Sequence, residues 1–253
     1  MSTQTQPRHH IERVRHELRR RTITVTSVID LSPKMRRFVF TAPDLSDFNS
    51  AGVDDHIKLF FGEENGERLM RDFTPRAFDN ATQSLTVDFA LHDHGPAAHW
   101  AQTAQIGTTL DIGGPRGSQI VPDDFDWYLL IADETGLPSI GRRLEGLRGG
   151  VPVTTIVLVD SPAEAQQIET QTAWTAQWLA RNEGEGDDQA RLLAALSALE
   201  WPQGEGYVWI AAEAGVAKAL RAHVLEERGH PPAWMRAAGY WLKGEAGAHE
   251  NFG

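Results

Sequence analysis

The chain has 253 residues, of which 41% are hydrophobic and 23% charged, and it carries a net charge of −11 and no cysteine. This composition is typical of a folded globular protein with one large domain or two smaller ones, and its acidity excludes most nucleic-acid partners. The lack of thiols excludes disulfides, thiolate catalysis and cysteine-ligated iron–sulfur clusters, so redox chemistry would need an organic cofactor or a metal held by other ligands.

Residues 1–21 are polar and rich in arginine and histidine, without the apolar stretch of a secretory signal. They predict a solvent-exposed basic arm or helix; an arm that binds a membrane surface or nucleic acid is the less favoured alternative. The sequence contains no apolar run long enough to span a membrane. We therefore expect a cytoplasmic monomer with no integral membrane segment and no nucleic-acid partner.

Residues 22–122 show short apolar runs and alternating patterns, separated by turn residues. These patterns predict strands at residues 22–30, 36–40, 56–61, 84–91 and 108–112. Strands at such spacing predict an antiparallel β-barrel domain.

Residues 123–253 alternate between strand and helix patterns, and the boundary falls near 119–125, where apolar periodicity is weak. The predicted strands are 126–133, 151–160 and 207–213, and the predicted helices are 138–148, 163–169, 189–199 and 215–229. This order predicts an α/β domain with a parallel sheet. The expected fold class is thus α+β with two domains.

The segment RDFTPR at residues 71–76 places Arg71 and Arg76 on either side of Phe73 and Thr74. Two arginines can neutralise a pyrophosphate, and an aromatic ring can pack on a flat heteroaromatic ligand. An ordinary loop with two surface arginines would have the same sequence, so this segment alone leaves both interpretations open.

The segment HDHGPAAHWA at residues 92–101 places small residues at the start of a predicted helix. Such a start leaves backbone N–H groups open to a phosphate, which the helix dipole also favours. His92, His94 and His99 could instead hold a metal. Since no H-E-x-x-H spacing supports that alternative, we predict no metal site.

Two further segments suggest close approach of a ligand. GGPRG at residues 113–117 is a predicted tight turn. ADETGLPSIGRRLE at residues 132–145 follows a hydrophobic strand and opens a helix, so that Thr135 and Gly136 stand at the carboxyl end of that strand. Ligands of open α/β sheets bind at this end.

The segments RDFTPR, HGPAAHWA, GPRG, DETGLPSI, WIAAEAGVAKALRAHV and GYWLKGE follow one another between residues 71 and 245. On these segments the chain resembles the siderophore-interacting proteins, the FAD-dependent, NAD(P)H-using ferric-siderophore reductases among the ferredoxin-reductase-like flavoproteins. The resemblance implies that residues 22–122 form the FAD-binding domain and residues 123–253 the NAD(P)H-binding domain. The chain differs from the family in Phe73 for tyrosine, Ala132 for glycine and Leu242 for a basic residue, so one substrate-binding cation stays unidentified.

The resemblance also implies site residues, none of which acts as an acid or base. Those assigned to the isoalloxazine, ribityl and pyrophosphate parts of FAD are Arg71, Phe73, Thr74 and Arg76. Those beside the flavin are Asp88, Phe89 and His92. Those at the pyrophosphate and adenine end are Gly95, Pro96, Ala97, Ala98 and Trp100. Those at the nicotinamide-facing edge are Asp133, Glu134, Thr135 and Pro138, with Tyr240 and Trp241 closing the site.

The substrate implied by the resemblance is a ferric siderophore, which is usually anionic or polar, so an acidic protein needs a local cationic pocket to bind it. The candidate cations are Lys58, Arg116 and Lys243.

The choice of nicotinamide rests on the residues around the second strand of the α/β domain. Asp160 ends a predicted strand, where a carboxylate accepts from a ribose diol and repels a 2′-phosphate, which favours NADH. Lys218 and Arg221 could instead receive that phosphate.

The implied reaction passes a hydride from NAD(P)H to FAD and then single electrons to two ferric chelates, which releases ferrous iron. Two alternatives stay open at this point. One is a general flavin or quinone reductase of the same fold, and the other is a non-enzymatic flavoprotein that binds siderophores.

Overall fold

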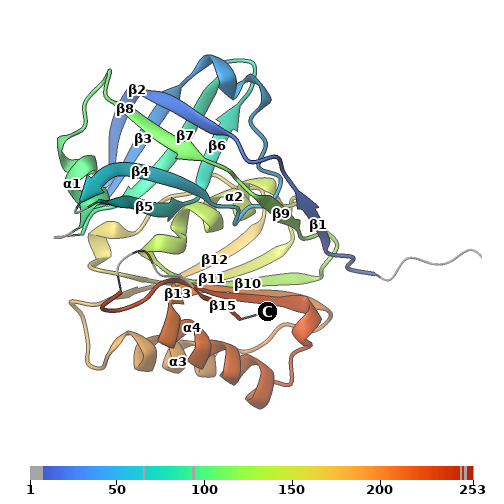
Figure 1. Ribbon diagram of the computed structural model, residues 1–253. Helices are drawn as coiled ribbons and strands as arrows, with labels where there is room; N and C mark the ends of the chain where they lie inside the picture. The colour runs from blue at the N-terminus through green and yellow to red at the C-terminus, as the bar shows by residue number, and fades with distance from the viewer. Residues whose placement is uncertain (1–7, 65, 93–94, 246, 248–249, 253) are drawn as a thin grey trace, which may run out of the picture.

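The computed structural model describes residues 8–64, 66–92, 95–245, 247 and 250–252. Two sheets lie one above the other, and helix α2 (Leu137–Gly146) lies between them (Figure 1). Helices α3 (Asp188–Ala198) and α4 (Ala214–Ala222) cover the opposite face of the lower sheet.

The upper sheet has seven antiparallel strands in the order β5-β4-β8-β2-β3-β7-β6. Their bounds are Arg20–Ser32 (β2), Met35–Thr41 (β3), Ile57–Glu64 (β4), Glu67–Phe73 (β5), Pro75–Asp79 (β6), Ser84–Ala90 (β7) and Thr109–Gly113 (β8). A 3₁₀ helix spans Pro43–Asp47 and helix α1 spans Pro96–Thr103. Only Thr74 separates the two edge strands β5 and β6, so the sheet must curl until its edges meet, which makes the predicted barrel.

The lower sheet has six strands in the order β12-β11-β10-β13-β14-β15, and the first five run parallel. Their bounds are Trp127–Asp133 (β10), Pro152–Val159 (β11), Ala173–Ala180 (β12), Gly206–Glu213 (β13), Met235–Trp241 (β14) and Glu250–Asn251 (β15). Short 3₁₀ helices span Glu134–Gly136, Pro162–Glu164 and Pro232–Trp234, and a π-helical turn spans His223–Glu227.

The central strand β10 is buried on both faces, as parallel strands between helices usually are. Tyr128 and Leu130 belong to the core under α2, whereas Leu129 and Ile131 belong to the core under α3 and α4. A third core fills the barrel and includes Phe38, Phe40 and Ile57. In the described part of the chain, every helix is too short or too polar to cross a membrane.

The N-terminal segment crosses from the barrel to the α/β domain. Strand β1 (Glu12–Arg15) pairs antiparallel with β9 (Gly117–Ile120). On the N-terminal side of β1, the buried ring of His9 stacks on Phe125 with 3.8 Å between ring centroids. Its Nδ1 lies 2.6 Å from Asp124 Oδ1 and its Nε2 lies 3.0 Å from Glu205 Oε2. We call residues 8–19 the arm; it is fixed to both domains.

The predicted strands of both domains are confirmed, as are the helices that begin near residues 138, 189 and 215. The predicted N-terminal helix is wrong for the described part of the arm, because β1 forms there through pairing with β9. The predicted helix at residues 163–169 is also wrong: only Pro162–Glu164 forms a 3₁₀ turn, and the chain then continues to β12. Strands β5, β6, β9, β12, β14 and β15 are not among the predicted strand ranges.

Candidate functional site

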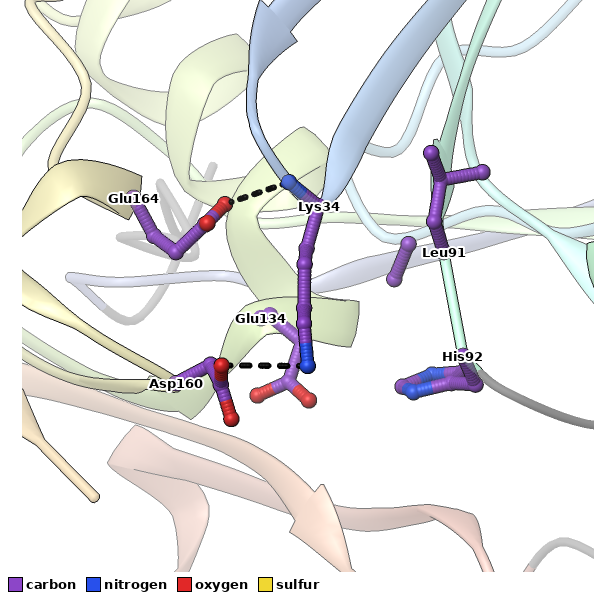
Figure 2. A pocket seen from close by; sticks show the side chains of 7 residues that line it. Lys34, Leu91, His92, Glu134, Asp160 and Glu164 are labelled. Atoms are coloured by element: carbon purple, nitrogen blue, oxygen red, sulfur yellow. Dashed lines mark hydrogen bonds and ion pairs between the residues drawn. The ribbon is translucent and has the colours of Figure 1, made fainter. Parts of the chain in front are cut away.

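A cavity of about 270 Å³ lies where the barrel meets the carboxyl ends of β10 and β11. Its lining residues are Lys34, Ala90, Leu91, His92, Glu134, Asp160 and Glu164. Lys34, Leu91 and His92 come from the barrel, and the acidic residues come from the α/β domain (Figure 2). The carboxyl edge of a parallel sheet is where such domains bind nucleotides.

The β2–β3 turn closes one side of this cavity. Buried Glu164 accepts hydrogen bonds from Ser32 Oγ and from the backbone N–H of Lys34 at 3.0 Å. The Lys34 Nζ lies 3.0 Å from Asp160 Oδ2. Figure 2 shows the contacts of Lys34 with Glu164 and with Asp160. The barrel is thus held to the carboxyl edge of the sheet by two carboxylates.

The RDFTPR segment spans the corner between β5 and β6. The Phe73 ring packs against Phe89, with 4.3 Å between centroids. Thr74 is buried, and its hydroxyl lies 3.2 Å from Ser139 Oγ, which in turn lies 3.2 Å from the Tyr240 hydroxyl. A chain of three hydroxyls therefore joins the barrel, α2 and β14.

Arg76 and Asp88 take part in ion pairs between protein groups. Arg76 pairs with Glu145 of α2 and lies 3.8 Å from Asp88 Oδ2. Asp88 accepts two hydrogen bonds from Arg37, at 2.7 and 2.8 Å. Neither of these two predicted flavin contacts lines the cavity. Arg76 instead connects the barrel to α2, and Asp88 forms an ion pair within the barrel.

Helix α1 is preceded by its N-cap residue Gly95, whose φ of +103° suits glycine and whose Cβ position has no atom within 4 Å. No described side chain caps the first turn, and it contains no acidic residue. Pro96 and Ala97 are half-buried, Ala98 is buried, and the Trp100 ring lies on Phe89 at 5.4 Å. The open backbone N–H groups of this turn fit a phosphate group. His94 lies outside the described residues, and the described residues contain no group of three potential metal ligands.

Asp133 fixes the residues at the opposite side of the site. It is 2% exposed and accepts hydrogen bonds from Thr135 N at 2.9 Å, Glu213 N at 3.1 Å and Trp241 Nε1 at 2.8 Å. Its neighbour Glu134 pairs with Arg181 at 2.8 Å. Burial raises the pKa of Asp133 to about 6. The Trp241 indole is therefore held in place by a carboxylate that titrates near neutral pH.

The raised pKa of Asp133 predicts a pH-dependent difference in stability between the wild type and Asp133→Asn. The folded state binds this proton more tightly than the unfolded state, whose aspartate pKa is ~3.9, so the stabilisation is complete below that pKa and lost as pH rises through about 6. Between pH 4 and 7 we expect wild type to lose ~1–3 kcal/mol relative to Asp133→Asn. Urea unfolding across this range measures the difference; parallel pH profiles for the two proteins would contradict the prediction.

The three predicted substrate cations differ in their surroundings. Lys58 Nζ makes two contacts with the Asp72 carboxylate, at 2.9 and 3.0 Å, so its charge is compensated. The side chains of Arg116 and Lys243 are exposed. Lys58 and Arg116 flank the turn at Gly113–Gly114, because Lys58 is in register with Gly113. Lys243 lies in a different place, after β14.

Sequence reasoning missed a buried polar cluster between the two domains. Asp54 is 6% exposed and lies 2.6 Å from Arg236 Nε and 3.2 Å from Trp209 Nε1. Its neighbour Asp55 accepts from Ser50 and Ser118, and burial raises its pKa. The only sequence signal was a pair of adjacent aspartates before β4, which surface loops also have.

The fold class is confirmed by solved structures. The chain is similar to the flavohem-like FAD/NAD-binding domain of nitric oxide dioxygenase from Vibrio cholerae, with a TM-score of 0.66 and 16% identity over 85% of this chain and 96% of that one. It is more similar to a siderophore utilization protein from T. fusca, with a TM-score of 0.86 and 35% identity over 94% of this chain and 98% of that one. These likenesses define the ferredoxin-reductase-like class.

Sequence comparison identifies the family. Residues 125–244 match the siderophore-interacting protein family, and residues 24–69 and 62–119 match the siderophore-interacting FAD-binding domain. The NADPH-dependent ferric-chelate reductase of Escherichia coli (strain K12) is 34% identical, covering 91% of this chain and 96% of that protein. The chain belongs to the siderophore-interacting protein family, as its motifs predicted, and the predicted enzyme class agrees with this relative.

Proposed function

We propose that this protein is an NAD(P)H-dependent ferric-siderophore reductase with FAD as its cofactor. In the balanced reaction one NAD(P)H and two ferric chelates give NAD(P)⁺, a proton, two ferrous ions and the two released siderophores. The observation that carries this proposal is the meeting of three features at one domain interface: the β5–β6 corner, the uncapped start of α1 and the Asp133–Trp241 contact. The cytoplasmic location and the monomeric state remain predictions of the sequence.

The cofactor would be held by residues of the barrel and enclosed by residues of the α/β domain. Phe73 and Thr74 would hold the flavin side, and Arg71 together with the first turn of α1 would hold the pyrophosphate. FAD, when bound, accepts a hydride and gives up the two electrons singly. Tyr240 and Trp241 would exclude water from the site. Because the residues need only bind, orient and shield, we assign no general acid or base.

The visible spectrum of the purified protein tests the proposal. We expect a flavin band near ~450 nm that bleaches under anaerobic NADH and returns when a ferric chelate is added. A band that does not bleach would make the protein a siderophore-binding flavoprotein without reductase activity. Bleaching followed by equally fast reoxidation with quinones and ferric chelates would instead indicate a general flavin reductase.

Replacing Arg71 by alanine is expected to weaken FAD binding at least tenfold. A charge-assisted contact to phosphate contributes ~1.5–3 kcal/mol, which corresponds to a factor of ~10 or more. Arg68→Ala is the matched control, because Arg68 lies on the same strand and pairs with Glu63 at 3.5 Å in solvent. Fluorescence titration of the apoprotein measures both affinities. Equal affinities for the two variants would remove Arg71 from the FAD site.

For the nicotinamide we propose a preference for NADH, with Asp160 as its determinant. Asp160 directly follows β11 and faces the cavity, where a carboxylate accepts from a ribose diol and repels a 2′-phosphate. Lys218 and Arg221 lie on α4, which covers the opposite face of the sheet (Figure 1), so they lose support as phosphate ligands.

Asp160→Asn is therefore expected to lower kcat/KM for NADH and to raise it for NADPH, shifting the ratio of the two by about tenfold. The physical reason is the loss of one acceptor and one negative charge beside the positively charged Lys34. Steady-state ferric-chelate reduction with each nucleotide measures the ratio. A wild-type preference for NADPH above ~10-fold would contradict the assignment.

A further inference from the structure

We propose that Lys34, which belongs to the FAD-binding barrel, is a phosphate ligand for the adenosine half of the nicotinamide nucleotide, which otherwise binds to the α/β domain. This inference rests on the proposed function, because it concerns the nucleotide that reduces the cofactor. It assigns a residue from the β2–β3 turn to a site formed mainly by the carboxyl ends of β10 and β11.

The cavity has the chemistry of a nucleoside phosphate site. Asp160 offers an acceptor for a ribose diol, and Ala90 and Leu91 offer apolar wall. Lys34 and His92 offer nitrogen groups that suit a phosphate. Figure 2 shows both side chains directed toward the space beside Asp160 and Glu134.

The size and lining of the cavity select one half of the dinucleotide. The cavity volume of about 270 Å³ lies just below the ~300–1,000 Å³ of pockets that take drug-sized ligands, so its enclosed space suits one half of a dinucleotide better than the whole. His92 and Glu134, which the resemblance assigned to the flavin and to the nicotinamide-facing edge, line the cavity, whereas the proposed flavin contacts Phe73, Thr74, Tyr240 and Trp241 do not. The nicotinamide therefore extends toward those residues, and the adenosine half stays in the cavity.

The position of Lys34 is set independently of its charged end. Its backbone N–H donates to buried Glu164 at 3.0 Å, and Glu164 also accepts from Ser32. These contacts fix the turn, whereas the Nζ reaches Asp160 at 3.0 Å with both side chains 47% exposed. An ion pair this exposed is weak, so a nucleotide that brings a diol to Asp160 and a phosphate to Lys34 replaces one contact by two.

Binding of ADP-ribose, measured by isothermal titration calorimetry on the FAD-loaded protein, tests the assignment. ADP-ribose carries the adenosine half of the nucleotide and cannot donate a hydride. We expect Lys34→Ala to raise its Kd by about 5–30-fold, and Lys34→Arg to retain most of the affinity. Lys218→Ala removes the same charge from exposed α4 and is expected to change the Kd by less than about twofold.

A second experiment uses reduced nicotinamide mononucleotide, which lacks the adenosine half. Lys34→Ala should raise KM for NADH but leave KM for the mononucleotide unchanged. An unchanged Kd for ADP-ribose, or equal losses with both reductants, would overturn the assignment. If wild type binds ADP-ribose in this Lys34-dependent way but its flavin is not bleached by NADH, the reductase proposal fails and the Lys34 assignment stands.

Discussion

Replacing Arg236 by methionine should destabilise the folded protein by ~3–5 kcal/mol, the cost of leaving a buried carboxylate without its counter-charge. Asp54 is 6% exposed, and Arg236 Nε lies 2.6 Å from it. Trp209 Nε1, which donates to Asp54 at 3.2 Å, is neutral and cannot balance the charge. Arg142 also acts electrostatically on Asp54, but its guanidinium hydrogen-bonds to Ser50 instead. Because Asp54 precedes β4 of the barrel and Arg236 lies on β14, the loss also weakens the contact between the domains. Urea unfolding monitored by circular dichroism measures the effect.

Two controls separate this effect from a general loss of arginine. Combining Arg236→Met with Asp54→Asn removes both charges and should recover most of the stability, since a buried pair is often replaceable by neutral groups. Arg68→Ala breaks an ion pair whose side chains are 58% and 63% exposed and should change stability by less than ~1 kcal/mol. A double variant no more stable than Arg236→Met would contradict the ion-pair explanation.

Gly206→Ala is expected to cost about 3 kcal/mol or more, because it overpacks a well-filled core. Gly206 begins β13 in register with Trp127 of β10. A Cβ at Gly206 would lie 2.1 to 2.3 Å from three atoms of the Trp127 indole, which is 4% exposed. The ring cannot move away without displacing the core on the α3 and α4 side. Urea unfolding measures the loss.

The matched control is Gly146→Ala, because no atom lies within 4 Å of a Cβ at the end of α2. It should change stability by no more than ~0.5 kcal/mol. In a Trp127→Leu background the steric conflict is gone, so Gly206→Ala should cost far less than in wild type, even if the single variant fails to fold. Equal costs in both backgrounds would show that backbone conformation, and not the indole, limits this position.

Local pattern was sufficient for most strands that have one buried face or two, but it missed β14, whose residues are mostly buried. The alternation in β2, β3 and β7 and the apolar runs of β10, β11 and β13 predicted these strands because burial selects their residues directly. Strands β5 and β6 contain charges and a proline, and β12 is an edge strand with four exposed residues out of eight. Strand β1 depends on β9, which lies about a hundred residues further along the chain, so no local pattern could identify it.

In the candidate site, too, local features could be predicted from the sequence, whereas contacts between distant segments could not. The motifs predicted ligand contacts at the RDFTPR segment, at the start of α1 and at the end of β10, because each is a local chain feature. They could not show that Arg76 and Asp88 pair with Glu145 and Arg37, or that Asp72 compensates Lys58, since these partners come from distant segments. The role of Lys34 depends likewise on a turn of one domain reaching a strand end of the other.

The arm adds a second connection between the two domains. The arm and residues 117–126 cross between the domains as two hydrogen-bonded segments, and both reach the amino edge of the parallel sheet, next to Phe125 and Glu205. The cavity lies at the carboxyl edge, one strand length away. The arm therefore joins the domains at the amino edge, while the contacts of Lys34 with Glu164 and Asp160 join them at the carboxyl edge, so the interface is held at both ends.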